Sequence, residues 1–82
     1  MNQELKAKWV AALRSGEYKQ GQGAMRPTPD TYCCLAVLRD ACDVDPFQQG
    51  FGHSVLVRMN DGEFGERKHS FDEIADWIEA NL

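Results

Sequence analysis

The sequence predicts a mainly α-helical, compact domain of three to four helices with a long loop rich in glycine and proline. Apolar residues recur at helical spacing near both ends of the chain, and a wholly apolar, cysteine-bearing segment, Tyr32–Leu38, lies between them. Glycines and prolines gather in residues 17–31. A chain of 82 residues suits one domain, so we expect 1–82 to fold as a single domain.

The first helix is expected over residues 3–15. Leu5, Trp9 and Leu13 recur every four residues and form one apolar face. Gly16 follows directly, and glycine readily takes the left-handed conformation that ends many helices.

Residues 17–31 are expected to form a loop. Their glycines and prolines interrupt regular structure, and loops of this length in small domains are often functional. A short strand at residues 24–26 remains open.

The second helix is expected to begin near Asp30 or Thr31, since either side chain is able to cap it, and to run to about Asp43, ahead of Pro46. It is expected to be the central, most buried helix, with the first and last helices packed on it. Its apolar residues cover more than one face: Cys34, Leu35, Val37, Leu38, Ala41 and Cys42.

The segment 55–59 fits two structures. Val55, Val57 and Met59 alternate as in a strand, whereas Val55, Leu56 and Met59 share one side of a helical turn. If this segment pairs with residues 24–26, the fold becomes a small α+β domain with a short two-stranded element. Asn60-Asp61-Gly62 then forms a turn.

The last helix begins at a capping box, in which Ser70 and Glu73 each bond the other's main-chain N–H. Trp77 is expected at the margin of its buried face. The other expected buried residues are Phe71, Ile74, Ala75, Ile78 and Leu82, and the expected solvent-facing ones are Asp72, Glu73, Asp76 and Glu79.

The net charge of −4 is unevenly distributed. Residues 1–26 carry five basic and two acidic side chains, a net charge of +3, and residues 27–82 carry four basic and eleven acidic ones, a net charge of −7. This acidic body argues against direct nucleic-acid binding, which needs a basic face, but suits a basic surface on another protein. No apolar run approaches the roughly 18 residues of a membrane span, and no signal peptide is visible, so we expect a cytoplasmic protein without membrane contact.

The cysteines and histidines do not predict a metal site. Zinc sites usually show two closely spaced ligand pairs, which this chain lacks, so we expect no metal and no cofactor. The odd number of cysteines indicates free thiols in a reducing compartment. No known catalytic motif is present, and we do not expect an enzyme. The residues considered for these sites are Cys33, Cys34, Cys42, His53 and His69.

Two loops supply the candidate binding residues. In residues 18–26, glycines expose main-chain N–H groups and two side chains add positive charge, which would suit a phosphate or an acidic partner. The alternative is a packed connector whose glycines only satisfy the backbone geometry. Loop phenylalanines are able to anchor a protein interface. The full candidate set is Tyr18, Lys19, Gln20, Gln22, Arg26, Phe47, Phe51, Asn60 and Asp61.

Four segments together resemble a family of small uncharacterised proteins found in tailed phages, prophages and bacteria. They are Trp9–Gly21, Tyr32–Leu38, Met59–Asp61 and Ser70–Glu79. The resemblance brings no assigned activity and no catalytic residues. It implies a phage accessory protein that acts inside the infected bacterial cell. Family members often carry a longer segment where this chain has only residues 43–54, so a function housed there is not carried over.

Small size, acidic balance and loop aromatics favour a module that binds a host protein and inhibits or modulates it, for instance a defence or nucleic-acid-handling protein. One alternative is a small-ligand or nucleotide-binding module that uses residues 18–26 with the Asn60-Asp61 turn. Another is a thiol-dependent enzyme around Cys33 or Cys34. The exposed edge of a small helical core is also compatible with a homodimer.

Overall fold

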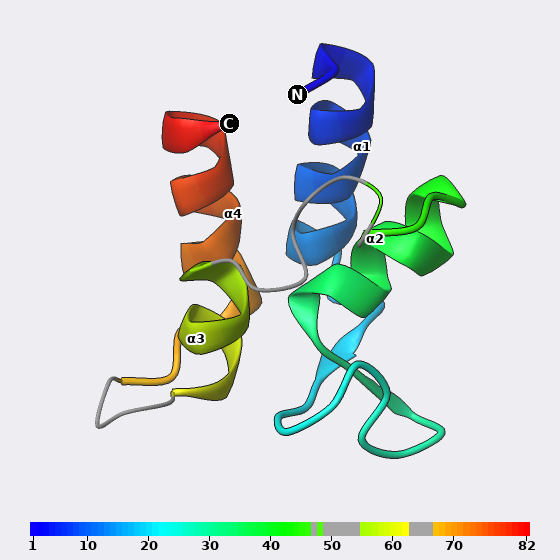
Figure 1. Ribbon diagram of the computed structural model, residues 1–82, viewed down its shortest axis with the longest axis vertical. Helices are drawn as coiled ribbons and strands as arrows, with labels where there is room; N and C mark the ends of the chain where they lie inside the picture. Colours follow the sequence, from blue (N-terminus) through cyan, green and yellow to red (C-terminus); the bar gives the residue numbers. More distant parts are fainter. Residues whose placement is uncertain (47, 49–54, 63–66) are drawn as a thin grey trace.

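The computed structural model describes residues 1–46, 48, 55–62 and 67–82 (Figure 1). Within these residues the chain forms four helices and one two-stranded element, so the mainly α prediction is confirmed. The element order is α1 (Gln3–Arg14), β1 (Lys19–Gln20), β2 (Thr31–Tyr32), α2 (Cys34–Cys42), α3 (Val55–Asp61) and α4 (Phe71–Asn81).

Helix α1 lies between its two main partners, α2 and α4, while α4 packs principally on α1 and α3. The expectation that the last helix packs on the second helix is therefore wrong in its main contact. Trp9 explains the arrangement: its side chain is fully buried against α2, and its indole N–H donates to the main-chain oxygen of Cys34 at 3.0 Å. As expected, α2 is the most buried helix, with five consecutive buried residues from Cys34 to Leu38.

Helices α1 and α4 run in opposite directions, so both ends of the chain lie together (Figure 1). The terminal ammonium group of Met1 donates to the main-chain oxygen of Leu82 at 3.3 Å. The segment between β1 and β2 lies at the other end of the molecule (Figure 1). A surface near that segment is therefore remote from both termini.

The first and last helices end and begin as predicted. Ser15 caps α1, and Gly16 has the expected positive φ of 77°. At the start of α4, the Ser70 hydroxyl accepts from the Glu73 main-chain N–H at 3.2 Å, and the Glu73 carboxylate accepts from the Ser70 main-chain N–H at 3.1 Å.

Helix α2 begins later than predicted. Its N-cap is Cys33, in an extended conformation, rather than Asp30 or Thr31. Thr31 instead pairs with β1, and its hydroxyl accepts from the main-chain N–H of Thr28 at 3.1 Å. Strand pairing thus removes Thr31 from the helix, and Asp30 lies in the turn before that strand.

Residues 55–61 form a helix, so the strand interpretation of 55–59 and its pairing with 24–26 are wrong. Leu56, Met59 and Asn60 are buried along one side of α3, which satisfies the apolar pattern by helical packing. The two-stranded element is present elsewhere: β1 and β2 pair in parallel, with Lys19 opposite Thr31 and Gln20 opposite Tyr32. Within the described part of the chain, each helix is too short or too polar to span a bilayer.

Candidate functional site

Asn60 is fully buried at the end of α3 and makes four hydrogen bonds. Its side-chain oxygen accepts from the amide of Gln20 at 3.0 Å and from the main-chain N–H of Cys34 at 3.2 Å. Its side-chain nitrogen donates to the main-chain oxygen of Gly21 at 2.8 Å and to the carboxylate of Asp61 at 2.9 Å. Both donors and both acceptor positions of the amide are occupied. Asn60 thereby ties β1, the start of α2 and α3 together.

Gln20 extends this connection towards α4. Its amide also donates to the main-chain oxygen of His69 at 2.8 Å. The main-chain N–H of His69 in turn donates to the main-chain oxygen of Met59 at 2.7 Å. The structure therefore brings three predicted binding residues together, Gln20, Asn60 and Asp61. Because the two amides and the Asp61 carboxylate bond to the protein itself, the geometry favours the packed-connector interpretation at these positions.

Gly21 makes a close approach that the sequence did not reveal. Its main-chain N–H donates to the main-chain oxygen of Tyr32 at 2.9 Å, which extends the β1–β2 contact by one residue. A Cβ atom at Gly21 would lie 2.8 Å from both Cβ and Oγ1 of Thr31 and 3.0 Å from Cγ of Pro27. A residue with a Cβ atom would therefore clash at this position. The clash follows from where Thr31 lies in the folded chain, so the sequence alone does not reveal it.

A chain of side-chain contacts crosses the surface beside this strand pair. The Arg26 guanidinium lies 4.0 Å from the centroid of the Tyr32 ring. The Tyr32 and Tyr18 rings meet edge to face, with centroids 4.9 Å apart and planes at 87°. The Tyr18 hydroxyl donates to the Asp40 carboxylate at 2.6 Å. We call Tyr18, Arg26, Tyr32 and Asp40 the tyrosine–arginine patch.

Hydrogen bonds within and beside the patch hold its side chains in place. The hydrogen bond to Asp40 is the main cause that raises the pKa of Tyr18 to about 12, so its phenol keeps the proton that it donates to Asp40 well into the alkaline range. Arg26 also donates to the main-chain oxygen of Pro29, which fixes the guanidinium over the ring. The two tyrosines are half-buried, whereas Arg26 and Asp40 are exposed.

A hollow of about 260 Å³ adjoins Tyr18, between the end of α1, β1 and the start of α4. A side chain from a bound partner would find both apolar and polar groups in it. It is lined by Leu13, Arg14, Gly16, Tyr18, Gln20, Ser70, Phe71 and Asp72.

The remaining candidate residues are dispersed or lie outside the described chain. Lys19 is exposed next to the patch, and Gln22 is half-buried. Phe47 and Phe51 lie outside the described residues, as does His53. Sequence reasoning missed Tyr32 and Asp40 as site residues because it assigned both to a helix. A signal for Asp40 was present, since a carboxylate that follows the apolar run Cys33–Leu38 is expected to face solvent.

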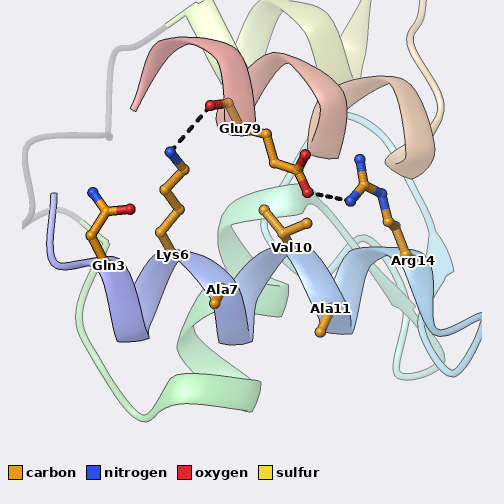
Figure 2. Close-up of a pocket in the computed structure, with 7 residues that line it drawn as sticks. All are labelled: Gln3, Lys6, Ala7, Val10, Ala11, Arg14 and Glu79. Atoms are coloured by element: carbon orange, nitrogen blue, oxygen red, sulfur yellow. Dashed lines mark hydrogen bonds and ion pairs between the residues drawn. The ribbon is translucent and has the colours of Figure 1, made fainter.

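A second surface feature is a groove of about 350 Å³ between α1 and α4, which we call the α1–α4 groove (Figure 2). Val10 lies between two cationic side chains that reach across to α4. Lys6 donates to the main-chain oxygen of Glu79 at 3.1 Å, and Arg14 donates to the Glu79 carboxylate and to Asp76. The groove is lined by Gln3, Lys6, Ala7, Val10, Ala11, Arg14 and Glu79.

The three thiols are free and not activated. Burial raises the pKa of Cys33, of Cys34 and of Cys42 above the ordinary thiol value, so the reactive thiolate is scarce at neutral pH. The Cys34 thiol, which has no exposed surface, contacts the main-chain oxygen of Leu56 at 3.6 Å. Within the described residues, histidines, cysteines and carboxylates form no group of three that would hold a metal ion.

Comparison with known protein families places a match on the first part of the chain. A family model described as a domain of unknown function (DUF8296) matches residues 1–49, which is more than half of the chain. No curated protein and no solved structure matches the chain. The matched region contains α1, β1, β2 and α2, and with them every residue of the tyrosine–arginine patch.

Proposed function

The chain belongs to the DUF8296 family, and because that family's description states no function, we propose one from the surface of the protein. We propose that it is a small accessory protein of phage type that binds a host protein and modulates it. The binding surface is the tyrosine–arginine patch. The observation that carries this proposal is the unbroken series of contacts from Arg26 through Tyr32 and Tyr18 to Asp40.

These residue types suit protein recognition. Tyrosine and arginine are enriched among the residues that contribute most to protein–protein affinity. Ordering flexible side chains at an interface costs about 0.5–1.5 kcal/mol for each of them. Here Arg26 is held against Tyr32, and the hydroxyl of Tyr18 is held by Asp40, before any partner arrives. Binding therefore costs less side-chain entropy, because the folded protein already orders these side chains.

The charges around the patch favour a protein over a nucleic acid. Arg26 and Lys19 are accompanied by the acidic side chains of Glu17, Asp30 and Asp40, and all five are exposed. Phosphate backbones need a continuous basic face, whereas protein surfaces carry both signs. A patch of mixed charge with two aromatic rings therefore suits a protein surface.

The patch lies within the region of the chain that the family model matches. Tyr18, Arg26, Tyr32 and Asp40 all lie in residues 1–49. That the partner belongs to an infected bacterial cell, is a defence or nucleic-acid-handling protein, and is met in the cytoplasm rests on the resemblance to small phage and prophage proteins.

The test is an affinity capture from bacterial lysate with variants of the patch. A tag at either terminus lies at the end of the molecule away from the β1–β2 loop (Figure 1). We expect the wild-type protein to capture one stoichiometric host protein, with or without nuclease. Arg26→Ala removes the cation from the Tyr32 ring, and Tyr18→Phe removes the bond to Asp40, so each should weaken capture.

Lys68→Ala is the matched control, because Lys68 is an exposed cation outside the patch. A loss of about 1.4 kcal/mol in binding would lower the affinity tenfold. If the Arg26→Ala variant captures the host protein as strongly as the Lys68→Ala variant does, the patch is not the binding surface. If no host protein is captured, the proposal of a host partner fails as a whole.

A further inference from the structure

The hollow of about 260 Å³ beside Tyr18, which we call the Tyr18 hollow, has an apolar floor. Leu13 near the end of α1 and Phe71 at the start of α4 line it, and both belong to the apolar core. Tyr18 lines it as well and is half-buried. A side chain that enters the hollow is therefore able to bury its own apolar stem there.

Gln20 gives the Tyr18 hollow a fixed hydrogen-bond acceptor. Its side-chain nitrogen donates to Asn60 at 3.0 Å and to the main-chain oxygen of His69 at 2.8 Å, so both N–H groups of the amide are used. Within the described contacts, its side-chain oxygen accepts no hydrogen bond, and it is not a buried atom. Because Gln20 lines the hollow while Asn60 and His69 do not, this oxygen is the polar atom that Gln20 offers to a bound group.

Asp72 adds an unpaired negative charge to the Tyr18 hollow. It lines the hollow from the first turn of α4 and is exposed. Among the residues that the structure describes, its carboxylate makes no ion pair. Arg14 is the cation among the described lining residues, and Asp76 and Glu79 already neutralise it (Figure 2 shows the contact with Glu79). The charge that remains unpaired is therefore negative.

This combination of groups suits a guanidinium. A guanidinium is always charged, presents five N–H donors in one plane and stacks on aromatic rings. It offers donors to the Gln20 oxygen and the Asp72 carboxylate and is attracted to the Tyr18 ring. The aliphatic stem of an arginine covers apolar surface such as that of Leu13 and Phe71. From the fixed acceptor, the unpaired carboxylate and the apolar floor, we propose that the Tyr18 hollow binds an arginine side chain.

The source of that arginine rests on the proposed function, because it is the host protein that supplies the side chain. Tyr18 belongs both to the hollow and to the tyrosine–arginine patch, so one partner surface is able to cover both. The acidic balance of residues 27–82 suits a basic partner surface. Arginine is also enriched among the residues that contribute most to protein–protein affinity.

The test is an NMR titration of the folded chain with the blocked peptide acetyl-Gly-Arg-Gly-amide at low ionic strength, where exposed charges are little screened. We expect a dissociation constant of roughly 1–10 mM. The side-chain amide signals of Gln20 and the main-chain signals of Gly16 and Asp72 should shift. A peptide with citrulline in place of arginine keeps the shape of the side chain and loses its charge, so it should bind at least about fivefold more weakly.

Variants of Asp72 test the charge of the hollow. Asp72→Asn should weaken binding of the arginine peptide about threefold, and Asp72→Glu should restore it. Glu4→Gln is the matched control, because Glu4 is an exposed carboxylate in the first turn of α1, at the far end of that helix from the hollow. Melting temperatures of the three variants verify that each is folded.

Four results would overturn the arginine site. One is an arginine peptide that shifts no signal of the lining residues at about 20 mM. The others are equal binding of the citrulline peptide, stronger binding of the corresponding aspartate peptide, and equal binding by the Asp72→Asn and Glu4→Gln variants.

The capture assay tests the host partner separately. If a host protein is captured but the arginine peptide does not bind the hollow, the arginine site fails and the host-binding proposal stands. If the peptide binds the hollow but the lysate yields no host protein, the arginine site stands and the host partner fails.

Discussion

The side-chain amide of Gln20 donates to the side-chain oxygen of Asn60 at 3.0 Å, joining positions 40 residues apart in the chain. The same Asn60 oxygen accepts from the first residue of α2, and the Asn60 nitrogen donates to Gly21. One buried amide thus fixes where β1, α2 and α3 meet. The tyrosine–arginine patch depends on it indirectly, because Tyr18 and Tyr32 belong to the segments that it holds.

Asn60→Ala should strongly destabilise the protein. It leaves the Gln20 amide and the main-chain groups of Gly21 and Cys34 without their buried partner, and we expect a loss of about 2–4 kcal/mol in the free energy of unfolding. Chemical denaturation measures it. Asn81→Ala is the control, since Asn81 is exposed and bonds only the main-chain oxygen of Trp77 among the described contacts. Near-equal stabilities of the two variants would contradict a structural role for Asn60.

The sequence predicted the helices whose apolar pattern and end signals lie within their own segments. Helices α1 and α4 each combine a periodic apolar face with a recognisable end, Gly16 in one and Ser70 with Glu73 in the other. The β1–β2 pair has only two residues in each strand, too few for any alternation to be visible. Thr31 is a good helix cap by residue type, and only its pairing with Lys19 excludes that role.

The fold brings part of the predicted binding set together, and the binding role of these residues stays a prediction. Gln20, Asn60 and Asp61 were expected to act together, and they are neighbours. Their burial was not visible from the sequence, because it depends on α3 packing beside the start of α2. Tyr18 and Tyr32 are 14 residues apart in the chain, and the parallel strand pair brings their rings into contact. No residue pattern in the sequence predicts this contact.

Gly21→Ala should destabilise the β1–β2 pair. The added methyl group would meet Thr31 at 2.8 Å, and we expect a cost of about 1–3 kcal/mol from the forced displacement. Thermal or chemical unfolding measures it. Thr31→Gly removes both of the nearest atoms. In a double-mutant cycle, the variant that carries both substitutions should therefore lose less stability than the sum of the losses in the two single variants. Strict additivity would mean that the two residues do not collide.

Tyr18 should ionise only at high pH. Its bond to Asp40 raises its pKa from the ordinary value of 10.0 to about 12, so the near-ultraviolet absorbance should show a step near pH 12. Because the folded pKa is raised, the stabilisation from this contact is complete below pH 10 and is lost as the pH rises from 10 to 12. Tyr18→Phe should abolish the step, and Tyr32→Phe should leave it. A step that survives Tyr18→Phe would assign it elsewhere.

Glu73 should link stability to acidic pH. The Arg67 guanidinium, 2.6 Å from the Glu73 carboxylate, and the Ser70 main-chain N–H lower the pKa of Glu73 from 4.5 to about 2. A lowered folded pKa gives stabilisation that is present above pH 4.5 and is lost as the pH falls towards 2. The melting temperature should therefore fall across this range.

Glu73→Gln should flatten that acid dependence while keeping the capping geometry, since glutamine also completes a capping box. Asp72→Asn is the control, because Asp72 is an exposed carboxylate of the same turn outside the box. If Asp72→Asn flattens the profile as much as Glu73→Gln, the acid sensitivity does not come from the capping box.

Alkylation should separate the three thiols by exposure. Cys42 is half-buried, whereas Cys33 is 7% exposed and Cys34 has no exposed surface. Since burial raises the pKa of all three, we expect slow reaction with iodoacetamide at neutral pH, with Cys42 first and Cys34 modified only when the protein unfolds. Mass mapping of native and denatured samples measures the order. Rapid modification of Cys33 or Cys34 in the native protein would instead favour the thiol-dependent enzyme, because a catalytic cysteine needs both access and a stabilised thiolate.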